Sequence, residues 1–384
     1  MLHLARHALA AAVVTLMPSG LFAYDTAARE VLVIDYDTGA VLLEKNADMA
    51  VPPASMSKLM TLNMLFEALE EDRFDLSDTF TVSETAWRKG GSTMFLEPRH
   101  RPTVEDLIRG IIVHSGNDAC IVVAENLAGS EAAFAAQMTA RGREIGLTAS
   151  NFANATGWPD PTHRMSIRDL VVLGERMIRD FPDHYPYFAE SEYSWQGISQ
   201  PNRNPLLTAG VGGDGLKTGH TEEAGFGLVG SAMQEGRRIV FAVNGLASSS
   251  ARAIETEQIT RWAFREFENA TLFEAGAQVA EAPVWIGASE NVPLVTAEDI
   301  IATIPRGSLA DISALAVFDG PLSAPVAAGA QVGHLSITIP NMPPLEVPLL
   351  AANDVAEAGF FSRFGAAAGL LANDAMSYAF GADG

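Results

Sequence analysis

The spacing of apolar residues predicts helices at four places before residue 268. Apolar residues recur every three or four positions over 59–66, directly after Ser55, and again over 103–128. The same spacing follows Ser166, whose hydroxyl is suited to cap a helix N-terminus, and it returns over 254–267. We therefore expect Ser55 in the first turn of the first helix, where unpaired backbone N–H groups favour negative charge.

Strand patterns lie before, between and after these helices. Residues 31–36 and 40–44 predict a β-hairpin around a glycine-containing turn, and residues 225–232 and 238–243 predict antiparallel neighbours. Later in the chain the helical periodicity ends, and short Val- and Ile-rich runs are separated by Pro and Gly. These runs predict a small all-β domain, and they cover residues 283–286, 300–304, 315–318, 332–339 and 345–349.

Together these patterns predict an α/β (α+β) fold in two domains. The 384 residues exceed the usual size of a single hydrophobic core. We expect a mixed domain over 24–268, in which an antiparallel sheet packs with helices, then a β-rich domain over 269–352 and an amphipathic tail over 353–384.

Residues 1–23 have the pattern of a secretory signal peptide. A short basic segment precedes an apolar run from Ala8 to Met17, which is too short to span a bilayer. We expect cleavage after Ala23, with Ala27 or Ala28 as alternatives. The mature chain would then work outside the cytoplasm.

The tail predicts an amphipathic helix over about 359–380. Its phenylalanines gather on one face, which favours an anchor lying in the plane of a membrane. Only Arg363 is basic there, so electrostatic attraction to anionic lipid is missing. Docking on the β-rich domain and disorder are therefore the alternatives.

Charge and cysteine content argue against several classes of site and partner. The formal net charge is −22, from 47 acidic and 25 basic residues without a basic cluster, so we expect no nucleic-acid partner. The single cysteine, Cys120, cannot form an internal disulfide, and we expect it to pack within a helix. No spacing typical of a metal site occurs, so we expect no metal and no cofactor.

The first candidate for chemistry is the segment Ser55-Met56-Ser57-Lys58. Lys58 lies one helical turn after Ser55 on the same face, about 5–6 Å away between Cβ atoms. A serine hydroxyl is a weak nucleophile until a base takes its proton, and a desolvated lysine with a lowered pKa is such a base. An N-cap serine beside an exposed lysine is the alternative, so this motif alone does not identify an enzyme.

Two further polar motifs follow. Ser115-Gly116-Asn117 interrupts the helical stretch 103–128, so both polar side chains can point from a turn into a cleft. Lys217-Thr218-Gly219 comes before the two predicted strands, and Gly219 lets another backbone approach closely. A phosphate-binding loop is excluded in this segment, because Leu216 stands where that motif needs lysine.

The three motifs occur in the order typical of serine enzymes that form acyl-enzymes with penicillin, which are the penicillin-binding proteins and the serine β-lactamases. The segments Pro53–Thr61, Ile108–Cys120 and Asp214–Thr221 resemble the low-molecular-mass penicillin-binding proteins that are serine-type D-alanyl-D-alanine carboxypeptidases. The resemblance runs from about Ala27 to the end of the chain. It implies that residues 24–268 form a β-lactamase-like catalytic domain.

The resemblance implies a catalytic role for five residues. Ser55 would attack the bond between two terminal D-alanines, and Lys58 would take the serine proton. Ser115 and Lys217 would relay the proton to the leaving D-alanine, while Asn117 would hold a peptide carbonyl of the substrate.

The same resemblance implies how the substrate is bound. Lys217, Thr218, Gly219 and His220 would line the substrate, and the backbone N–H groups of Ser55 and His220 would form the oxyanion hole. Peptidoglycan stem peptides would be the substrates and β-lactams the covalent inhibitors. The enzyme would work in the periplasm, in peripheral contact with the outer face of the inner membrane through its tail.

The chain departs from the family pattern at the expected carboxylate-binding arginine. The corresponding positions hold Ser199 and Leu246-Ala247, and Arg203 and Arg252 are the nearest substitutes. We expect His114, beside Ser115, to be a neutral packed residue rather than a base. Two other functions remain open at this point: a β-lactamase of the same fold, and a non-catalytic protein that binds or senses the cell wall.

Overall fold

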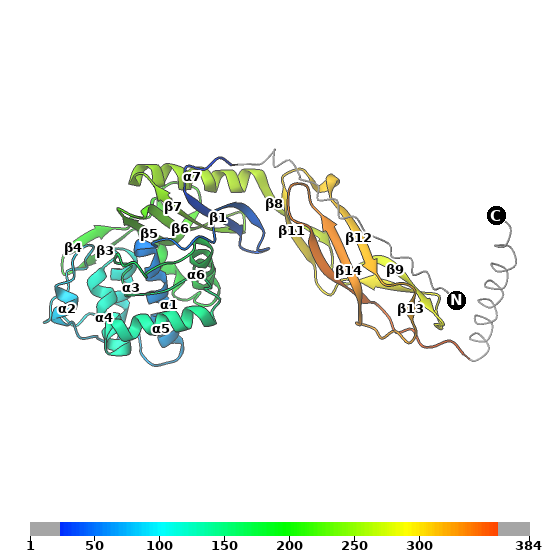
Figure 1. Ribbon diagram of the computed structural model, residues 1–384, viewed down its shortest axis with the longest axis horizontal. Coiled ribbons are helices and arrows are strands. Elements are labelled where there is room, and N and C mark those ends of the chain that lie inside the picture. Colours follow the sequence, from blue (N-terminus) through cyan, green and yellow to red (C-terminus); the bar gives the residue numbers. More distant parts are fainter. Residues whose placement is uncertain (1–23, 360–384) are drawn as a thin grey trace, which may run out of the picture.

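The computed structural model describes residues 24–359, which form a mixed helix-and-strand body followed by an elongated β-rich body (Figure 1). The predicted signal peptide, and the predicted tail helix beyond residue 359, lie outside the described residues. The two bodies confirm the expected mixed fold class with an all-β part at its C-terminal side.

The first body is built on a five-stranded antiparallel sheet with the strand order β2-β1-β7-β6-β5. Its strands are β1 Glu30–Asp35, β2 Val41–Lys45, β5 Gly213–Thr221, β6 Gly225–Gln234 and β7 Arg237–Leu246. The predicted hairpin is confirmed as β1 and β2, and the predicted antiparallel pair as β6 and β7. Because β1 pairs with β7, the sheet joins the first strand of the described residues to residues 239–244, far later in the chain.

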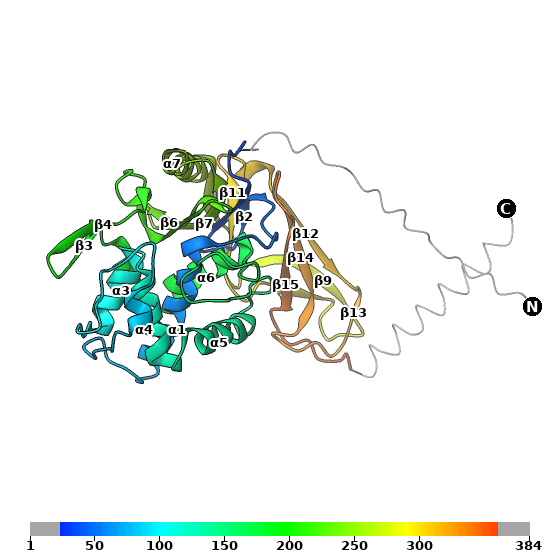
Figure 2. The same cartoon turned by 60° about the vertical axis from the view of Figure 1, so that its left-hand side comes forward.

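Helices cover both faces of this sheet (Figure 2). They are α1 Lys58–Glu70, α2 Glu84–Trp87, α3 Val104–Ile112, α4 Asn117–Ala128, α5 Glu131–Glu144, α6 Ile167–Arg179 and α7 Ser249–Glu266. Alternate residues of a strand face opposite sides of a sheet. Leu32 and Ile34 accordingly pack in the core beneath α1, α3, α4 and α6, whereas Val31 and Val33 pack in the core beneath α7.

The predicted helices are confirmed, with two changes of boundary. The stretch 103–128 forms α3 and α4, with Ser115 in the loop between them, and Ser166 caps α6 by accepting a hydrogen bond from the Asp169 N–H. Helix α7 begins at Ser249, five residues earlier than expected. Its first turn was not predicted because that turn lacks the apolar spacing on which the prediction rested. Phe267 belongs to the following strand rather than to the helix.

Helix α5 was not predicted. Its sequence is rich in alanine, and it buries Phe134, Ala135, Met138 and Gly142, a stripe too small to stand out by hydropathy. Within residues 24–359, no single helix is long and apolar enough to cross a bilayer, and α4 and α5 reach that length and hydropathy only together, across an 81° bend.

Short elements complete the first body. A two-stranded hairpin is formed by β3 Glu192–Trp195 and β4 Ile198–Pro201. Three 3₁₀ turns lie at Ala54–Ser57, Tyr185–Ala189 and Pro205–Leu207.

The second body is a β-structure around its own core. Its strands are β8 Phe267–Phe273, β9 Gln278–Trp285, β10 Asn291–Val295, β11 Ile300–Pro305, β12 Ser313–Phe318, β13 Leu322–Ser323, β14 Gln331–Thr338 and β15 Leu345–Ala351. Six of them form a sheet in the order β12-β14-β15-β10-β9-β13, and β11 pairs with β8. Every strand expected beyond residue 268 is present. The expected domain boundary at residues 268 and 269 falls within β8.

The two bodies meet without a linker. Helix α7 ends at Glu266 and β8 begins at Phe267. Asp35, at the end of β1, is fully buried between them: its carboxylate accepts hydrogen bonds from Arg237 Nε at 2.7 Å and from Asn269 Nδ2 at 3.1 Å. Thr38 and Thr303 join their hydroxyl groups across the same junction at 2.5 Å.

Candidate active site

Ser55 lies in the 3₁₀ turn that leads into α1, and not in the first turn of α1 itself as expected, because α1 begins only at Lys58. The turn is held by its own backbone: Ala54 has a positive φ of 48°, and the Ser57 hydroxyl donates to the Ala54 carbonyl at 3.1 Å. Gly157 packs against the same carbonyl, and a Cβ at that position would lie 1.9 Å from the Ala54 oxygen. Ser55 is half-buried, so its hydroxyl is held in place and still reachable.

Lys58 is fully buried one turn after Ser55. Its Nζ lies 2.8 Å from Ser55 Oγ, 2.8 Å from Asn117 Oδ1 and 2.6 Å from the Thr156 carbonyl oxygen. Burial lowers the pKa of Lys58 from its ordinary value of 10.5 to about 8, because a charged ammonium loses its hydration there.

These three contacts are those a neutral amine needs in order to act as a base. The Asn117 and Thr156 oxygens can only accept, so they take the two N–H bonds of a neutral Lys58 amine. The Ser55 hydroxyl can also donate, so it remains free to give its proton to the nitrogen lone pair. The predicted pairing of Ser55 and Lys58 on one face is confirmed in position.

The second and third motifs lie beside this pair. Ser115 and Lys217, separated by 102 residues, join through a hydrogen bond from Lys217 Nζ to Ser115 Oγ at 3.0 Å. Both side chains are buried, and Ser115 has a positive φ of 58° in the turn between α3 and α4. Burial, with the nearby charge of Lys58, lowers the pKa of Lys217 well below its ordinary value.

Strand β5, at the end of the sheet, runs directly past the Ser55 turn. A Cβ at Gly219 would lie 3.0 Å from the Pro53 carbonyl oxygen and 3.2 Å from Ala54 Cβ, so the absence of a side chain lets β5 approach the turn closely. Thr218 is almost buried beside Lys217, and the exposed His220 ring stacks on Phe226 with the ring centroids 3.8 Å apart. The structure therefore brings all eight sequence-predicted site residues together.

Several groups that hold the site were not predicted. The Thr156 carbonyl accepts from Lys58, and the Gly90 carbonyl accepts from Asn117 Nδ2 at 2.9 Å. Backbone carbonyls leave no side-chain signature, so no sequence signal marks them. Asp118 binds the backbone N–H groups of Met94 and Leu96 at 2.9 and 3.0 Å, and its place directly after the Ser-Gly-Asn motif was the one available signal.

The structure places the four residues considered for the missing carboxylate-binding arginine as follows. Ser199 is exposed on β4 and Leu246 is buried in the core, so neither supplies a cation. Arg203 donates to Ser92 Oγ at 2.7 Å, and its charge lowers the pKa of Lys217. Arg252, nearly buried, donates to the Arg203 carbonyl at 3.2 Å. Neither guanidinium forms an ion pair with a carboxylate of residues 24–359.

His114 and Cys120 have the packing roles predicted for them. His114 is buried, its Nε2 lies 2.9 Å from the Tyr193 carbonyl oxygen, and burial lowers its pKa, which favours the neutral ring. Cys120 is buried in α4, and burial raises the pKa of its thiol to about 12. The thiolate that a nucleophilic cysteine needs is therefore absent near neutral pH.

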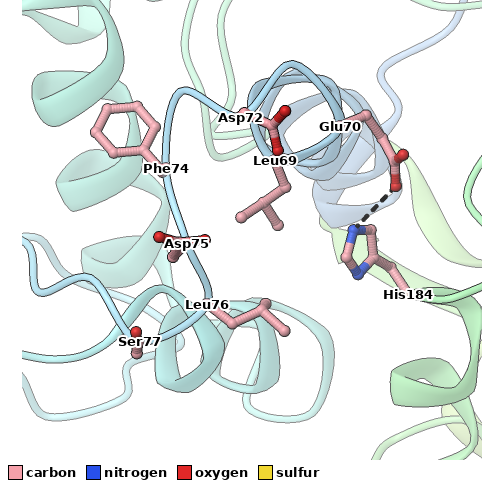
Figure 3. Close-up of a pocket in the computed structure, with 8 residues that line it drawn as sticks. All are labelled: Leu69, Glu70, Asp72, Phe74, Asp75, Leu76, Ser77 and His184. Atoms are coloured by element: carbon pink, nitrogen blue, oxygen red, sulfur yellow. Dashed lines mark ion pairs between the residues drawn. The ribbon is translucent and has the colours of Figure 1, made fainter.

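A separate hollow lies at the far end of α1 (Figure 3). It is lined by residues from 69–77 and by His184, whose Nε2 lies 3.4 Å from Glu70 Oε1. Lys58 begins α1 and Glu70 ends it, which separates the hollow from the lysine by about 18 Å along the helix axis. This hollow is therefore not part of the candidate site.

Comparisons with known proteins identify the family of this chain. Residues 17–247 match the D-alanyl-D-alanine carboxypeptidase family, and residues 267–357 match the C-terminal domain of penicillin-binding protein 5. The chain is 36% identical over 344 residues to the D-alanyl-D-alanine carboxypeptidase DacA of Escherichia coli, which covers 88% of this chain and 85% of that protein.

Two solved structures extend the comparison. Penicillin-binding protein 5 from Haemophilus influenzae is similar with a TM-score of 0.78 and 34% identity, over 88% of this chain and 100% of that chain. Penicillin-binding protein D2 from Listeria monocytogenes, in its ampicillin-bound form, is similar with a TM-score of 0.57 and 26% identity, over 62% of this chain and 97% of that chain.

Proposed function

Because the chain belongs to the D-alanyl-D-alanine carboxypeptidase family, we propose that it is the serine-type enzyme that removes the terminal D-alanine from peptidoglycan pentapeptide stems. The observation that carries this proposal is the 2.8 Å contact between Lys58 Nζ and Ser55 Oγ in a buried site that also holds Asn117 and Lys217.

Acylation begins when Ser55 Oγ attacks the carbonyl carbon of the penultimate D-alanine and its proton passes to the Lys58 amine. The bond from Oγ to carbon forms, and negative charge develops on the substrate oxygen. The backbone N–H groups of Ser55 and His220 stabilise this charge, and a donor of this kind is worth about 3–4 kcal/mol. The close approach at Gly219, which brings β5 against the Ser55 turn, supports this assignment.

Collapse of the intermediate breaks the carbon–nitrogen bond and releases D-alanine, whose nitrogen needs a proton. Ser115 and Lys217 relay to it the proton that Lys58 took from Ser55, which returns Lys58 to the neutral amine; the 3.0 Å contact between Ser115 and Lys217 and the lowered pKa of Lys217 support this relay. Lys217, Thr218 and Arg203 bind the terminal carboxylate. Arg252 positions Arg203 by donating a hydrogen bond to its backbone carbonyl. Water then attacks the ester on Ser55 and releases the shortened stem.

The decisive assay uses a peptide that ends in acyl-D-Ala-D-Ala. The purified protein should release D-alanine, and Ser55→Ala should lower the rate by at least about a thousandfold, since the nucleophile is lost. Equal release by the Ser55→Ala variant would contradict the mechanism.

The same preparation separates the alternative functions by means of penicillin. The ampicillin-bound form of the Listeria protein supports β-lactams as covalent inhibitors here. A carboxypeptidase should keep the penicilloyl group on Ser55 for minutes or longer, which mass spectrometry detects. Rapid penicillin turnover would indicate a β-lactamase, and stable acylation without any peptide hydrolysis would indicate a binding or sensor protein.

For its location, the sequence of the two ends supports export to the periplasm and peripheral contact with the outer face of the inner membrane through residues 353–384. Deleting the residues after Asn353 and comparing membrane pelleting tests the tail. Equal pelleting of both forms would remove the anchor from the proposal.

A further inference from the structure

A groove of about 450 Å³ adjoins the candidate site on the side of Asn117. It is lined by Glu84, Thr85, Arg88, Lys89, Gly90 and Trp158. The Gly90 carbonyl accepts the hydrogen bond from Asn117 Nδ2, and a Cβ at Gly91 would lie 2.8 Å from that nitrogen and 2.9 Å from the Trp158 ring. The two glycines therefore separate the groove from Asn117 by the thickness of one backbone.

One uncompensated positive charge faces this groove. Lys89 Nζ lies 5.1 Å from the centroid of the Trp158 ring, and it forms no ion pair with any carboxylate of residues 24–359. Glu84, the acidic residue of the lining, is already paired with Arg88 at 2.6 Å. In a chain with a net charge of −22, a free ammonium over an exposed indole beside the reacting groups is unusual.

The direction of the bound substrate decides which part of it reaches the groove. In the proposed function, Lys217 and Thr218 lie at the terminal carboxylate, and Asn117 holds a carbonyl on the other side of the scissile bond. The residue upstream of the two D-alanines therefore passes Asn117 and arrives at Gly90 and Trp158. The exposed glycine backbone leaves room for a peptide there.

We propose that Lys89 and Trp158 form a specificity subsite that selects a stem peptide whose upstream residue carries a free side-chain carboxylate. The ammonium pairs with the carboxylate, and the indole face covers the aliphatic part of the same side chain. The proposal rests on the proposed function, because that function sets the direction of the substrate.

The test compares two peptides that differ only at the upstream residue, with a side chain ending in a carboxylate or in the isosteric carboxamide. We expect Lys89→Met to raise KM for the carboxylate peptide by about threefold to tenfold, with kcat nearly unchanged. KM for the carboxamide peptide should change less than about twofold, and Lys89→Arg should restore the preference.

A matched control removes a positive charge from the other side of the sheet. Arg261→Met, on α7, should leave KM for both peptides unchanged, which excludes a general effect of net charge. Equal effects of Lys89→Met on the two peptides, or no effect on either, would overturn the subsite while leaving the proposed function intact. If the unaltered enzyme releases D-alanine from neither peptide, the proposed function fails, and the subsite fails with it.

Discussion

Lys58 sets the conditions under which Ser55 reacts. Its side chain is fully buried, and its amine contacts the oxygens of the Asn117 amide and the Thr156 carbonyl. Because these oxygens can only accept hydrogen bonds, the proton that moves to the amine comes from Ser55. Sequence alone predicted the pairing of Ser55 with Lys58, because a three-residue spacing in a helix is a local property. It did not predict the Thr156 carbonyl, which is brought to the amine by a loop 98 residues away.

The lowered pKa of Lys58 predicts an alkaline rise in reactivity. Burial moves this pKa down to about 8, so the amine is mostly protonated at pH 7 and mostly neutral at pH 9. The second-order rate of penicillin acylation should rise about tenfold between pH 7 and pH 9 and then level off. Stopped-flow or mass-spectrometric acylation rates over this range measure it, and a flat or falling profile would contradict the assignment of Lys58 as base.

Replacing Gly157 should displace the turn that carries Ser55, although Gly157 does not contact the Ser55 side chain itself. An added Cβ would lie 1.9 Å from the Ala54 carbonyl oxygen, and the residue has a φ of 76°. Gly157→Ala should therefore lower the acylation rate at least tenfold and the free energy of unfolding by about 3 kcal/mol.

Gly146→Ala is the control for that change, because Gly146 has a φ of 89° with nothing within 4 Å of the added Cβ. It should cost about 1 kcal/mol of stability and leave acylation unchanged. Similar acylation rates for the two variants would show that the contact with the Ala54 carbonyl is unimportant.

At the scale of elements, patterns were predictable where the apolar contrast is strong. The amphipathic spacing in α3 and α6 determines which face of each helix is buried, whereas β1 is recognised by its continuous apolar run and is buried on both faces. Helix α5 was missed because alanine and glycine supply much of its buried face. Strand β5, which carries the Lys-Thr-Gly motif, has three glycines among its nine residues, and hydropathy alone does not identify it as a strand.

The start of α4 is tied to the segment beside the groove by one carboxylate. Asp118 accepts hydrogen bonds from the N–H groups of Met94 and Leu96 and from the Thr93 hydroxyl at 2.7 Å.

Asp118→Asn presents an amide to these donors, which should lower the free energy of unfolding by about 2–4 kcal/mol and slow acylation by displacing Asn117. Denaturant unfolding and penicillin labelling measure both effects. The exposed Asp319→Asn is the control, and an equally small effect of both changes would contradict this role.

At the scale of the whole molecule, the junction between the two bodies was beyond sequence reasoning. The change in composition after residue 268 predicted a second, all-β part, but no local pattern indicates that Asp35 of the first strand meets Asn269. The pairing of β1 with β7 has the same origin, because contacts between distant segments leave no periodic signal.

Asp35→Ala should weaken this junction and spare the chemistry. It leaves the largely buried Arg237 guanidinium without its carboxylate, a change that costs about 3–5 kcal/mol. Asp35 aligns through Ile239 and Ala232 with Gly213, at the opposite end of β5 from His220, so penicillin acylation should stay within about twofold.

Thermal unfolding and acylation rates of the Asp35→Ala variant test these two expectations, with the exposed Asp37→Ala as a control that should change neither. A large loss of acylation in a folded Asp35→Ala protein would show that the far end of the sheet controls the site.

Because α7 ends at Glu266 and β8 begins at Phe267, no flexible linker separates the body that carries Ser55 from the β-rich body. If the chain is held at its C-terminal side, the reactive serine stands at a fixed height and orientation above that attachment. Such an enzyme would trim stems only within one thin layer of the wall, and the length of its β-rich body would set the depth of that layer.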